Sequence, residues 1–373
     1  MTIRVLQIVN NMHRAGLETM LMNYYRHINK EKIQFDFLTH RIGNYAYDDE
    51  IRKLGGKIYH APRLYPQNYI SYFKFMKNFF ESHPEYKIVH SHIDSMSYLP
   101  LLAAKKAKIP IRIAHSHNTS IDFDYKFLLK ELFRYKIIDV ANYFCACGED
   151  AGIYLFRNKR KFKYIPNAIE KRNFLFNEEY RKRIRKEFGL ENKFVIGNIG
   201  RLEKQKNQQF LLDIFYKFNK INSNSVLIII GNGSQKEKIL SKIKKLRLDN
   251  SVILLENRSD VNKIYQAMDV FLMPSLYEGI PVVGIEAQYS GLPCLFSEGV
   301  PREVKFSRDA QFLSISNPNK WVERLILLSN RVKKENRKNV IFLNNDFDIN
   351  FSYILLQNYY LSLFDKLEEK YVD

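Results

Sequence analysis

Short apolar segments alternate with longer segments of mixed polarity along the first half of the chain. The apolar segments have the length of buried strands and occupy residues 3–9, 34–39, 57–59, 87–90, 111–114 and 143–146. Helix-length segments lie between them and include residues 18–27, 69–81 and 95–107. Strands that alternate with helices predict a parallel sheet that is covered by helices on both faces.

The alternation is interrupted at residues 166–170 and then resumes. A strongly charged helix is predicted at residues 178–188, and further strands are predicted at 194–199, 225–230, 251–255, 270–273 and 293–296. The expected fold class is therefore α/β, with two Rossmann-like, doubly wound domains that face each other across a cleft. The expected domains are residues 1–168, residues 169–350 and a C-terminal helix over 351–373 that packs back toward the first domain. A ligand of such sheets binds outside the carboxyl ends of the strands, which places it in the cleft.

A length of 373 residues exceeds what one hydrophobic core usually serves, in agreement with two domains. No apolar segment approaches the ~18–20 residues of a membrane span, and the apolar start of the chain is too short for a signal peptide. The cysteines, Cys145, Cys147 and Cys294, are odd in number and favour a reduced, cytoplasmic protein. The net charge of +19 attracts nucleic acid, anionic lipid or polyphosphate. No zinc-finger spacing or RNP-like sequence accompanies it, so we expect no nucleic-acid partner.

Two glutamates mark the second half: Glu278 lies in a loop with glycine and proline, and Glu286 lies in the predicted helix that follows. Pro281 is expected in the first turn of this helix, because proline has no N–H to leave unpaired there. The free N–H groups at the helix N-terminus suit a phosphate, and Glu286, roughly a turn and a half further on, can reach a second part of the same ligand. A diphosphate flanked by two hydroxyl-bearing rings, as in a sugar nucleotide, fits this layout. The alternative is an ordinary loop charge and a solvated helix residue.

Residues 275–293, which contain both glutamates, resemble the E-x7-E motif of the retaining glycosyltransferases of the GT-B fold, family 4. The resemblance implies that the first domain binds the acceptor and that the second binds a nucleotide-sugar donor. It also implies that Glu278 and the backbone after it hold hydroxyl groups of the donor sugar, and that Glu286 holds the ribose. The backbone after Glu278 consists of Gly279, Ile280, Pro281 and Val282.

Two cations follow a predicted strand end of the second domain, Arg201 and Lys206. The resemblance assigns both to the donor diphosphate, where fixed positive charge stabilises the negative charge that develops on the leaving group. A solvated basic loop is the alternative interpretation of this segment.

Two further turns match the family with one departure each. Gly16 follows the first strand and can let the backbone approach the donor phosphate, although Ala15 replaces the first of the family's two glycines. Arg258 lies in a turn that the family places around the base and ribose, where Glu256 stands in place of a common glycine. The residues therefore leave the choice among UDP, GDP and ADP open.

All nine histidines precede residue 118, and four of them form two His-x-His pairs, His90/His92 and His115/His117. Alternate residues of a strand share one face, and paired imidazoles can bind zinc. No nearby cysteine or carboxylate completes a ligand set, and the family needs no metal, so we expect neither a metal site nor a cofactor. The resemblance assigns His117 to the donor sugar near the reaction centre. His92 is expected to line the cleft on the acceptor side, and His90 and His115 stay unassigned.

Two other patterns leave alternatives open. Asp-x-Asp occurs at residues 122–124 and 346–348, and both copies are interpreted as loop residues rather than metal ligands. Residues 69–80 are aromatic and carry Lys74 and Lys77. They predict either a core helix of the first domain or a helix that lies on an anionic membrane surface.

The predicted activity is the retaining, metal-independent transfer of a sugar from a nucleotide-sugar donor, expected to be a UDP-sugar, to a hydroxyl group of a glycan or lipid-linked acceptor. Residues 16–26 and 286–288, with Trp321, resemble the exopolysaccharide and capsule members of the family, which implies bacterial surface polysaccharide biosynthesis. Such an enzyme is expected in the cytoplasm and, through its charge, at the inner face of the cell membrane. The alternatives are a sugar-nucleotide epimerase of the same fold and a basic membrane- or nucleic-acid-binding protein without catalysis.

Overall fold

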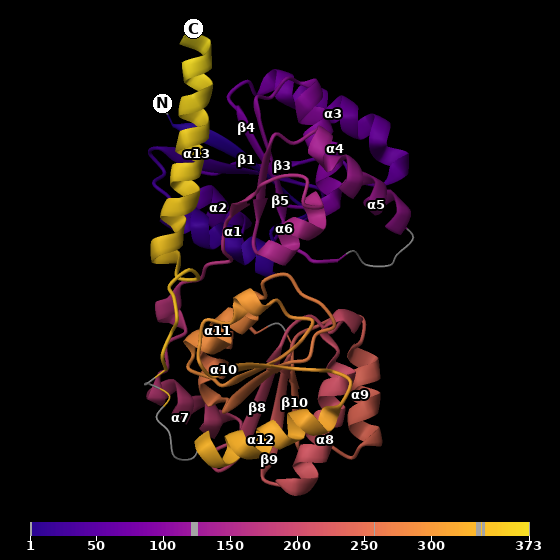
Figure 1. The fold of residues 1–373 in the computed structure, drawn as a ribbon, viewed down its shortest axis with the longest axis vertical. Helices are drawn as coiled ribbons and strands as arrows, with labels where there is room; N and C mark the ends of the chain where they lie inside the picture. Colours follow the sequence, from indigo (N-terminus) through magenta and orange to yellow (C-terminus); the bar gives the residue numbers. More distant parts are fainter. Residues whose placement is uncertain (1, 121–125, 257, 333–336, 338–339, 373) are drawn as a thin grey trace. The chain divides into compact units, whose positions relative to one another are not determined.

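The computed structural model describes residues 2–120, 126–256, 258–332, 337 and 340–372. The chain divides into two compact units, Met1–Ile169 with Asp346–Asp373 and Glu170–Asn345. Each unit is built on one parallel sheet with helices on both faces (Figure 1). The doubly wound α/β architecture that the alternating pattern predicts is therefore confirmed in both units.

The sheet of the first unit has the strand order β3-β2-β1-β4-β5-β6-β7. Its strands are β1 (Ile3–Val9), β2 (Ile33–Thr39), β3 (Ile58–His60), β4 (Ile88–Ser91), β5 (Ile111–Ser116), β6 (Tyr143–Ala146) and β7 (Lys163–Tyr164). Its helices are α1 (Gly16–His27), α2 (Asp48–Lys53), α3 (Tyr69–Ser82), α4 (Tyr98–Lys106), α5 (Phe127–Lys136), α6 (Glu149–Phe156) and α13 (Ile349–Val372).

Two separate cores cover the two faces of this sheet. Val5 and Val9 of β1 pack in the core that contains α1 and α13, whereas Leu6 and Ile8 pack in the core that contains α3 and α4. Because successive residues of a strand point to opposite faces, a strand between two helical layers must be apolar at nearly every position. This explains the continuous apolar run at the start of the chain.

Helix α3 contains the aromatic segment for which the sequence left two interpretations open. Its residues Tyr72, Met76 and Phe79 are buried and belong to the core on the α3 face of the sheet. Lys74 and Lys77 are exposed on the opposite side of the helix. The core-helix interpretation is therefore confirmed, and the two lysines are left at the surface.

The chain returns from the second unit to the first beside residue 169. Ile169 and Asp348 form a parallel bridge, and the amide of Ile169 donates to the carbonyl of Phe347 at 2.8 Å. Residues 346–350, which we had grouped with the second domain, therefore lie in the first unit, and α13 packs there through Tyr360 and its neighbours. Residues 346–348 form the connection before α13, as expected of loop residues. The other Asp-x-Asp copy, residues 122–124, lies outside the described residues.

The sheet of the second unit has the strand order β10-β9-β8-β11-β12-β13. Its strands are β8 (Phe194–Ile199), β9 (Ser225–Ile230), β10 (Val252–Leu255), β11 (Val270–Met273), β12 (Cys294–Ser297) and β13 (Ala310–Leu313). Its helices are α7 (Glu178–Glu187), α8 (Gln208–Ile221), α9 (Lys236–Lys245), α10 (Val261–Ala267), α11 (Val282–Tyr289) and α12 (Pro318–Val332). The winding direction reverses between β8 and β11, and ligands of open parallel sheets bind at such a switch point.

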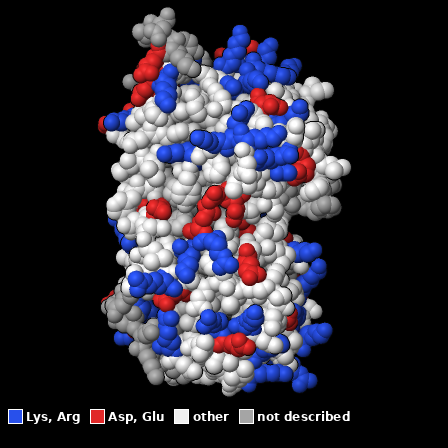
Figure 2. Space-filling model, viewed as in Figure 1, with Lys and Arg blue, Asp and Glu red and all other residues white. Residues whose placement is uncertain are grey.

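Lysine and arginine outnumber aspartate and glutamate, 59 to 40. Figure 2 shows Lys and Arg side chains scattered across the visible face, with Asp and Glu side chains among them. Among the described residues, no helix combines the length and the apolar character that crossing a membrane requires.

Candidate functional site

Most of the residues assigned to the donor lie in loops at one edge of the second unit's sheet. Arg201 and Lys206 follow β8, Arg258 follows β10, and Glu278 follows β11, with residues 279–281 leading into α11. Because the strands are parallel, their carboxyl ends meet at the same edge of the sheet. The topology therefore gathers residues that are up to about eighty positions apart, on the two sides of the switch point.

The loops after β8 and β11 are bonded to each other. The amide of Leu276 donates to the carbonyl of Gln205 at 2.8 Å, and the side chain of Gln205 donates to the carbonyl of Tyr277 at 2.9 Å. The side chain of Asn207 donates to the carbonyl of Pro274 at 3.1 Å. These bonds hold the two loops as one block. The sequence did not mark Gln205 or Asn207, because no local spacing signals a bond between distant loops.

The ammonium group of Lys206 lies 2.6 Å from Oε1 of Glu278. The two side chains are 15% and 6% exposed, so water screens their attraction little. From the sequence we assigned Lys206 to a diphosphate and Glu278 to a sugar, and the structure brings the two into contact. An ammonium group donates hydrogen bonds and a carboxylate accepts them. The pair therefore places a group that can donate to phosphate oxygens beside a group that can accept from a sugar hydroxyl.

Helix α11 begins next to this pair. Pro281 has extended backbone angles, φ −75° and ψ 116°, and its carbonyl accepts a hydrogen bond from the amide of Gly284 at 3.0 Å. The prediction that Pro281 lies in the first turn was therefore wrong by one residue, because Pro281 caps the helix and Val282 begins it. The N–H groups that precede Gly284 at the start of the helix have no carbonyl one turn earlier in the helix to bond to, and such groups suit an anion.

Glu286 of α11 is 8% exposed and has Tyr265 of α10 as its partner. The Tyr265 hydroxyl donates to Oε2 of Glu286 at 2.9 Å. Burial raises the pKa of Glu286 to about 7, and the hydrogen bond from Tyr265 offsets this only in part. The carboxyl group therefore gains or loses its proton near neutral pH. We did not find Tyr265 from the sequence, because it lies 21 residues away in a different helix.

Two other turns lie at the same edge of the sheet, after β10 and β9. The guanidinium of Arg258 donates two hydrogen bonds of 2.8 Å to Asp260, which fixes its plane. Gly231 has φ 155°, and a Cβ there would lie 1.9 Å from the carbonyl oxygen of Gly200. Glycine is therefore required where the loops after β8 and β9 meet. Arg201 is exposed at this edge.

The assigned residues of the first unit also lie at the carboxyl edge of their sheet. Gly16 is the first residue of α1, which follows β1, and His92 and His117 follow the neighbouring strands β4 and β5. Nδ1 of His92 lies 3.0 Å from Nε2 of His117. Burial lowers the pKa of His117 to about 3 and that of His92 well below its usual value, so both rings are neutral.

The unassigned histidines belong to the same cluster. The ring centroids of His90 and His92 are 4.2 Å apart, and those of His115 and His117 are 4.1 Å apart. Residues two apart on a strand share a face, so each His-x-His pair places both rings on the α13 side of the sheet. The sequence pattern contained this information, and we did not use it for His90 and His115.

Three of these rings are close enough to be tested as a metal site. One nitrogen of each of His90, His92 and His115 lies within 4.8 Å of the others. The rings, however, hydrogen-bond to one another and to Gln7 and Tyr360. A metal ion would have to displace these bonds, so the absence of a metal site stays our prediction.

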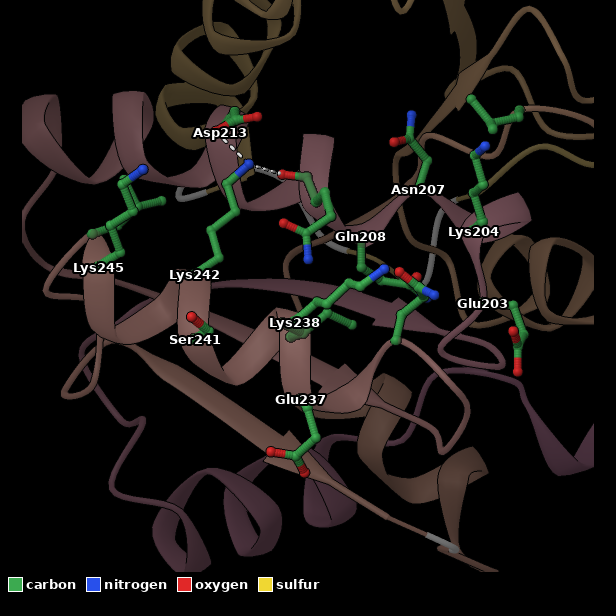
Figure 3. A pocket seen from close by; sticks show the side chains of 15 residues that line it. Glu203, Lys204, Asn207, Gln208, Asp213, Glu237, Lys238, Ser241, Lys242 and Lys245 are labelled. Carbon is green, nitrogen blue, oxygen red and sulfur yellow. Dashed lines mark hydrogen bonds and ion pairs between the residues drawn. The ribbon is translucent and has the colours of Figure 1, made fainter.

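A cavity of about 1080 Å³ lies between α8 and α9 of the second unit (Figure 3). Lys238 and Lys242 of α9 line it, and Lys242 forms an ion pair with Asp213 of α8 at 2.7 Å. The cavity shares part of the loop after β8 with the donor residues, but neither Lys206 nor Glu278 lines it. It therefore adjoins the candidate site without containing it.

The chain is similar in sequence to known proteins. The family described as Glycosyl transferases group 1 matches residues 180–341. EpsF of Bacillus subtilis (strain 168), which is named as a glycosyltransferase, is 35% identical over 332 residues that cover 86% of each chain. An Escherichia coli UDP-Gal:alpha-D-GlcNAc-diphosphoundecaprenol alpha-1,3-galactosyltransferase is 26% identical over 324 residues, which cover 82% of this chain and 78% of that enzyme.

A solved structure supports the fold. The crystal structure of Anabaena HepE in complex with UDP-glucose aligns with a TM-score of 0.81 and 16% identity, over 96% of this chain and 99% of HepE. The GT-B fold class is thereby confirmed. The chain aligns with EpsF over most of both sequences, and it belongs to the group 1 glycosyltransferases.

Proposed function

We propose that this glycosyltransferase takes a sugar from a UDP-sugar and transfers it, with retention of anomeric configuration and without a metal ion, to a hydroxyl group of a glycan or lipid-linked acceptor. The proposed role is a step of bacterial surface polysaccharide synthesis, on the cytoplasmic side of the cell membrane. The resemblance of residues 16–26 and 286–288 to exopolysaccharide and capsule enzymes supports this role.

The contact between Lys206 and Glu278 is the observation that carries the proposal. It puts a phosphate-binding cation and a hydroxyl-binding carboxylate 2.6 Å apart at the switch point of the sheet. The α11 N-terminus lies immediately after Glu278 in the chain. A sugar diphosphate is a ligand whose neighbouring parts need these groups side by side.

The names of the relatives support the donor and acceptor classes. The Escherichia coli relative is named for a UDP-sugar donor and a diphosphoundecaprenol-linked acceptor, and the HepE crystal contains UDP-glucose. Glu286 would then accept hydrogen bonds from the ribose hydroxyl groups, and Arg258, held by Asp260, would border the nucleotide.

The chemistry follows from where charge develops. When the bond from the sugar to the diphosphate breaks, the leaving oxygen gains negative charge, and Arg201 and Lys206 stabilise it with fixed positive charge. The acceptor attacks from the same face and passes its proton to the departing phosphate oxygen. Glu278 and Glu286 hold the donor and differ from the acid–base carboxylate pair of glycosidases. His117 of the first unit is proposed to contact the donor sugar. His92, which the sequence assigned to the acceptor side, is only 2% exposed and bonds through both ring nitrogens to His117 and Gln7, so it supports His117 from behind.

A panel of UDP-, GDP- and ADP-sugars tests the proposal. A ligand that binds only the folded state raises Tm, by an amount equivalent to ~2.7 kcal/mol at 100 times its Kd. We expect a UDP-sugar to raise Tm, and the same UDP-sugar to label a diphosphoundecaprenol-linked sugar with retained configuration. A flat response to all nucleotide sugars would overturn the proposed function.

A further inference from the structure

Six side chains of the first unit form one continuous chain of hydrogen bonds that ends at His117. They come from β1, α13 and the strands and loops of β4 and β5. In order, they are His117, His92, Gln7, Tyr360, His90 and His115. All except His117 are at most 2% exposed, so this chain is sealed from water behind His117.

Gln7 sets the direction of the first half of the hydrogen-bond chain, from His117 to Gln7. Oε1 of Gln7 can only accept, so Nε2 of His92 must carry the proton that it donates across 2.8 Å. A neutral imidazole has one N–H, so Nδ1 of His92 accepts. Nε2 of His117, which lies 3.0 Å from it, is then the donor. The low pKa values of the buried rings agree with neutral imidazoles.

The second half of the hydrogen-bond chain, from Gln7 to His115, runs in the same direction, with each group donating to the next. The amide group of Gln7 donates through Nε2 to the Tyr360 hydroxyl at 3.1 Å. Oη of Tyr360 lies 2.6 Å from Nδ1 of His90, a distance more typical of an O–H donor than of an N–H donor. His90 then donates through Nε2 to Nδ1 of His115 at 3.2 Å. Nε2 of His115 is buried and has no hydrogen-bond partner among the described residues.

We propose that Gln7 and Tyr360 are positioning residues that, through His92, hold His117 as the tautomer with its proton on Nε2 and its lone pair on Nδ1. No hydrogen bond within the described residues uses Nδ1 of His117. A lone pair there can only accept, so the group of the ligand that meets His117 is a donor such as a sugar hydroxyl. The inference rests on the proposed function, in which His117 meets the donor sugar, and it excludes His117 as a proton donor to the substrate.

The titratable neighbours do not reverse this assignment. Asp94 accepts the backbone N–H of His117 at 2.8 Å, so it holds the residue by its main chain. Burial raises the pKa of Asp94 to about 6 and that of Cys145, beside Tyr360, to about 12. Burial also raises the pKa of Tyr359, which lies beside Cys145. The two oxygens of the Asp94 carboxylate are therefore occupied by the backbone N–H of His117 and by the side chain of Asn118.

Long-range ¹H–¹⁵N NMR of the ¹⁵N-histidine-labelled full chain reads the tautomer directly, with signals assigned by single His→Gln variants. In the wild type we expect His117 and His92 to show protonated Nε2 and unprotonated Nδ1. A His117 signal with the proton on Nδ1 would overturn the inference. This measurement needs no nucleotide sugar to bind.

Variants of Gln7 and Tyr360 test the positioning role. Gln7→Met removes the acceptor of His92 and should give mixed tautomers of His92 and His117. Tyr360→Phe should also mix them, because the Gln7 amide group loses its acceptor and can turn. An unchanged His117 signal in both Gln7→Met and Tyr360→Phe would exclude the role.

Kinetics separate this role from a merely structural one. We expect Gln7→Met to raise KM for the donor roughly 3- to 10-fold, the size of one neutral hydrogen bond. An unchanged KM in Gln7→Met, with mixed tautomers in its His117 signal, would count against the tautomer as the cause. If the wild type binds no nucleotide sugar, the proposed function fails, and the NMR result still decides the direction of the hydrogen-bond chain.

Discussion

Lys206 and Glu278, which are 72 residues apart in the sequence, form a buried ion pair of 2.6 Å at the point where the winding of the second sheet reverses. Removing one partner of a buried pair leaves an uncompensated charge, which typically destabilises a protein by ~3–5 kcal/mol. Variants of either residue therefore need a stability measurement beside every activity measurement.

Replacement of Glu278 by glutamine tests the sugar contact with the least damage to the fold. The amide oxygen of glutamine can still accept a hydrogen bond from Lys206, but its bond to a sugar hydroxyl loses a charge-assisted contribution of ~1.5–3 kcal/mol. We expect kcat/KM for transfer to fall roughly tenfold or more. Tm should fall moderately, because the Lys206 ammonium keeps a hydrogen-bond acceptor but loses its counter-charge. Exposed Glu191→Gln is the matched control. Wild-type kcat/KM in Glu278→Gln would remove this residue from the donor site.

Alanine at Arg201 or Lys206 should weaken the binding of nucleoside diphosphate about tenfold or more, because each cation contributes a charge-assisted hydrogen bond to phosphate. Affinity for the nucleoside alone should change little, which calorimetry can compare. Lys204→Ala, an exposed lysine of the same loop, is the control. Equal losses for nucleoside and diphosphate would place both cations elsewhere.

The carboxyl group of Glu286 predicts opposite pH effects on stability and on binding. Its pKa is raised to about 7 from the usual 4.5, so the folded protein holds this proton more tightly than the unfolded chain. Its contribution to stability is therefore complete below pH 4.5 and is lost as the pH rises to 7, by about 3 kcal/mol. Donor binding should instead strengthen as the pH rises through 7, because the carboxylate accepts ribose hydroxyls better than the acid.

Glu286→Gln separates the two effects, since glutamine can still accept from Tyr265 and does not titrate. Relative to the wild type, the variant should gain stability between pH 5 and 8 in urea unfolding and should bind the donor with no pH step near 7. Tyr265→Phe should raise the pKa of Glu286 further. Parallel stability curves for the wild type and Glu286→Gln would show that Glu286 does not titrate in this window.

Activity should survive exhaustive treatment with EDTA, because the rings of His90, His92 and His115 are occupied by hydrogen bonds to one another and to Gln7 and Tyr360. Transfer is measured before and after chelation, with metal analysis of the protein. Loss of activity that zinc or manganese restores would establish a metal at the site and would contradict our prediction.

Lys74 and Lys77 should contribute to binding of vesicles that contain anionic lipid, since they lie exposed on α3 while its apolar face is used in the core. Each lysine near such a surface contributes ~1 kcal/mol, and the attraction fades over a Debye length of ~8 Å at physiological salt. Lys74→Glu with Lys77→Glu should weaken binding, and rising salt should do the same. Lys238→Glu with Lys245→Glu, which changes the net charge equally in the second unit, is the control. Equal binding to anionic and neutral vesicles would rule the surface out.

The apolar pattern by itself determined the strands and the fold class. Residues 3–9, 194–199, 225–230 and 270–273 form strands with the predicted bounds, because a strand buried between two helical layers has to be apolar throughout. The spacing of Glu278 and Glu286 likewise identified the loop and helix that follow β11, since both residues lie within one local segment of the chain.

Only the tertiary structure decided which side chains touch. Glu286 needed a partner, and nothing near it in the sequence identifies Tyr265. The pairing of Lys206 with Glu278 and the chain from His117 through Gln7 to Tyr360 also join residues from separate elements. The physical reason is that periodicity reports which face of a strand or helix is buried, whereas hydrogen-bond and ion-pair partners depend on how strands that are distant in sequence are ordered in the sheet and on which helix covers them.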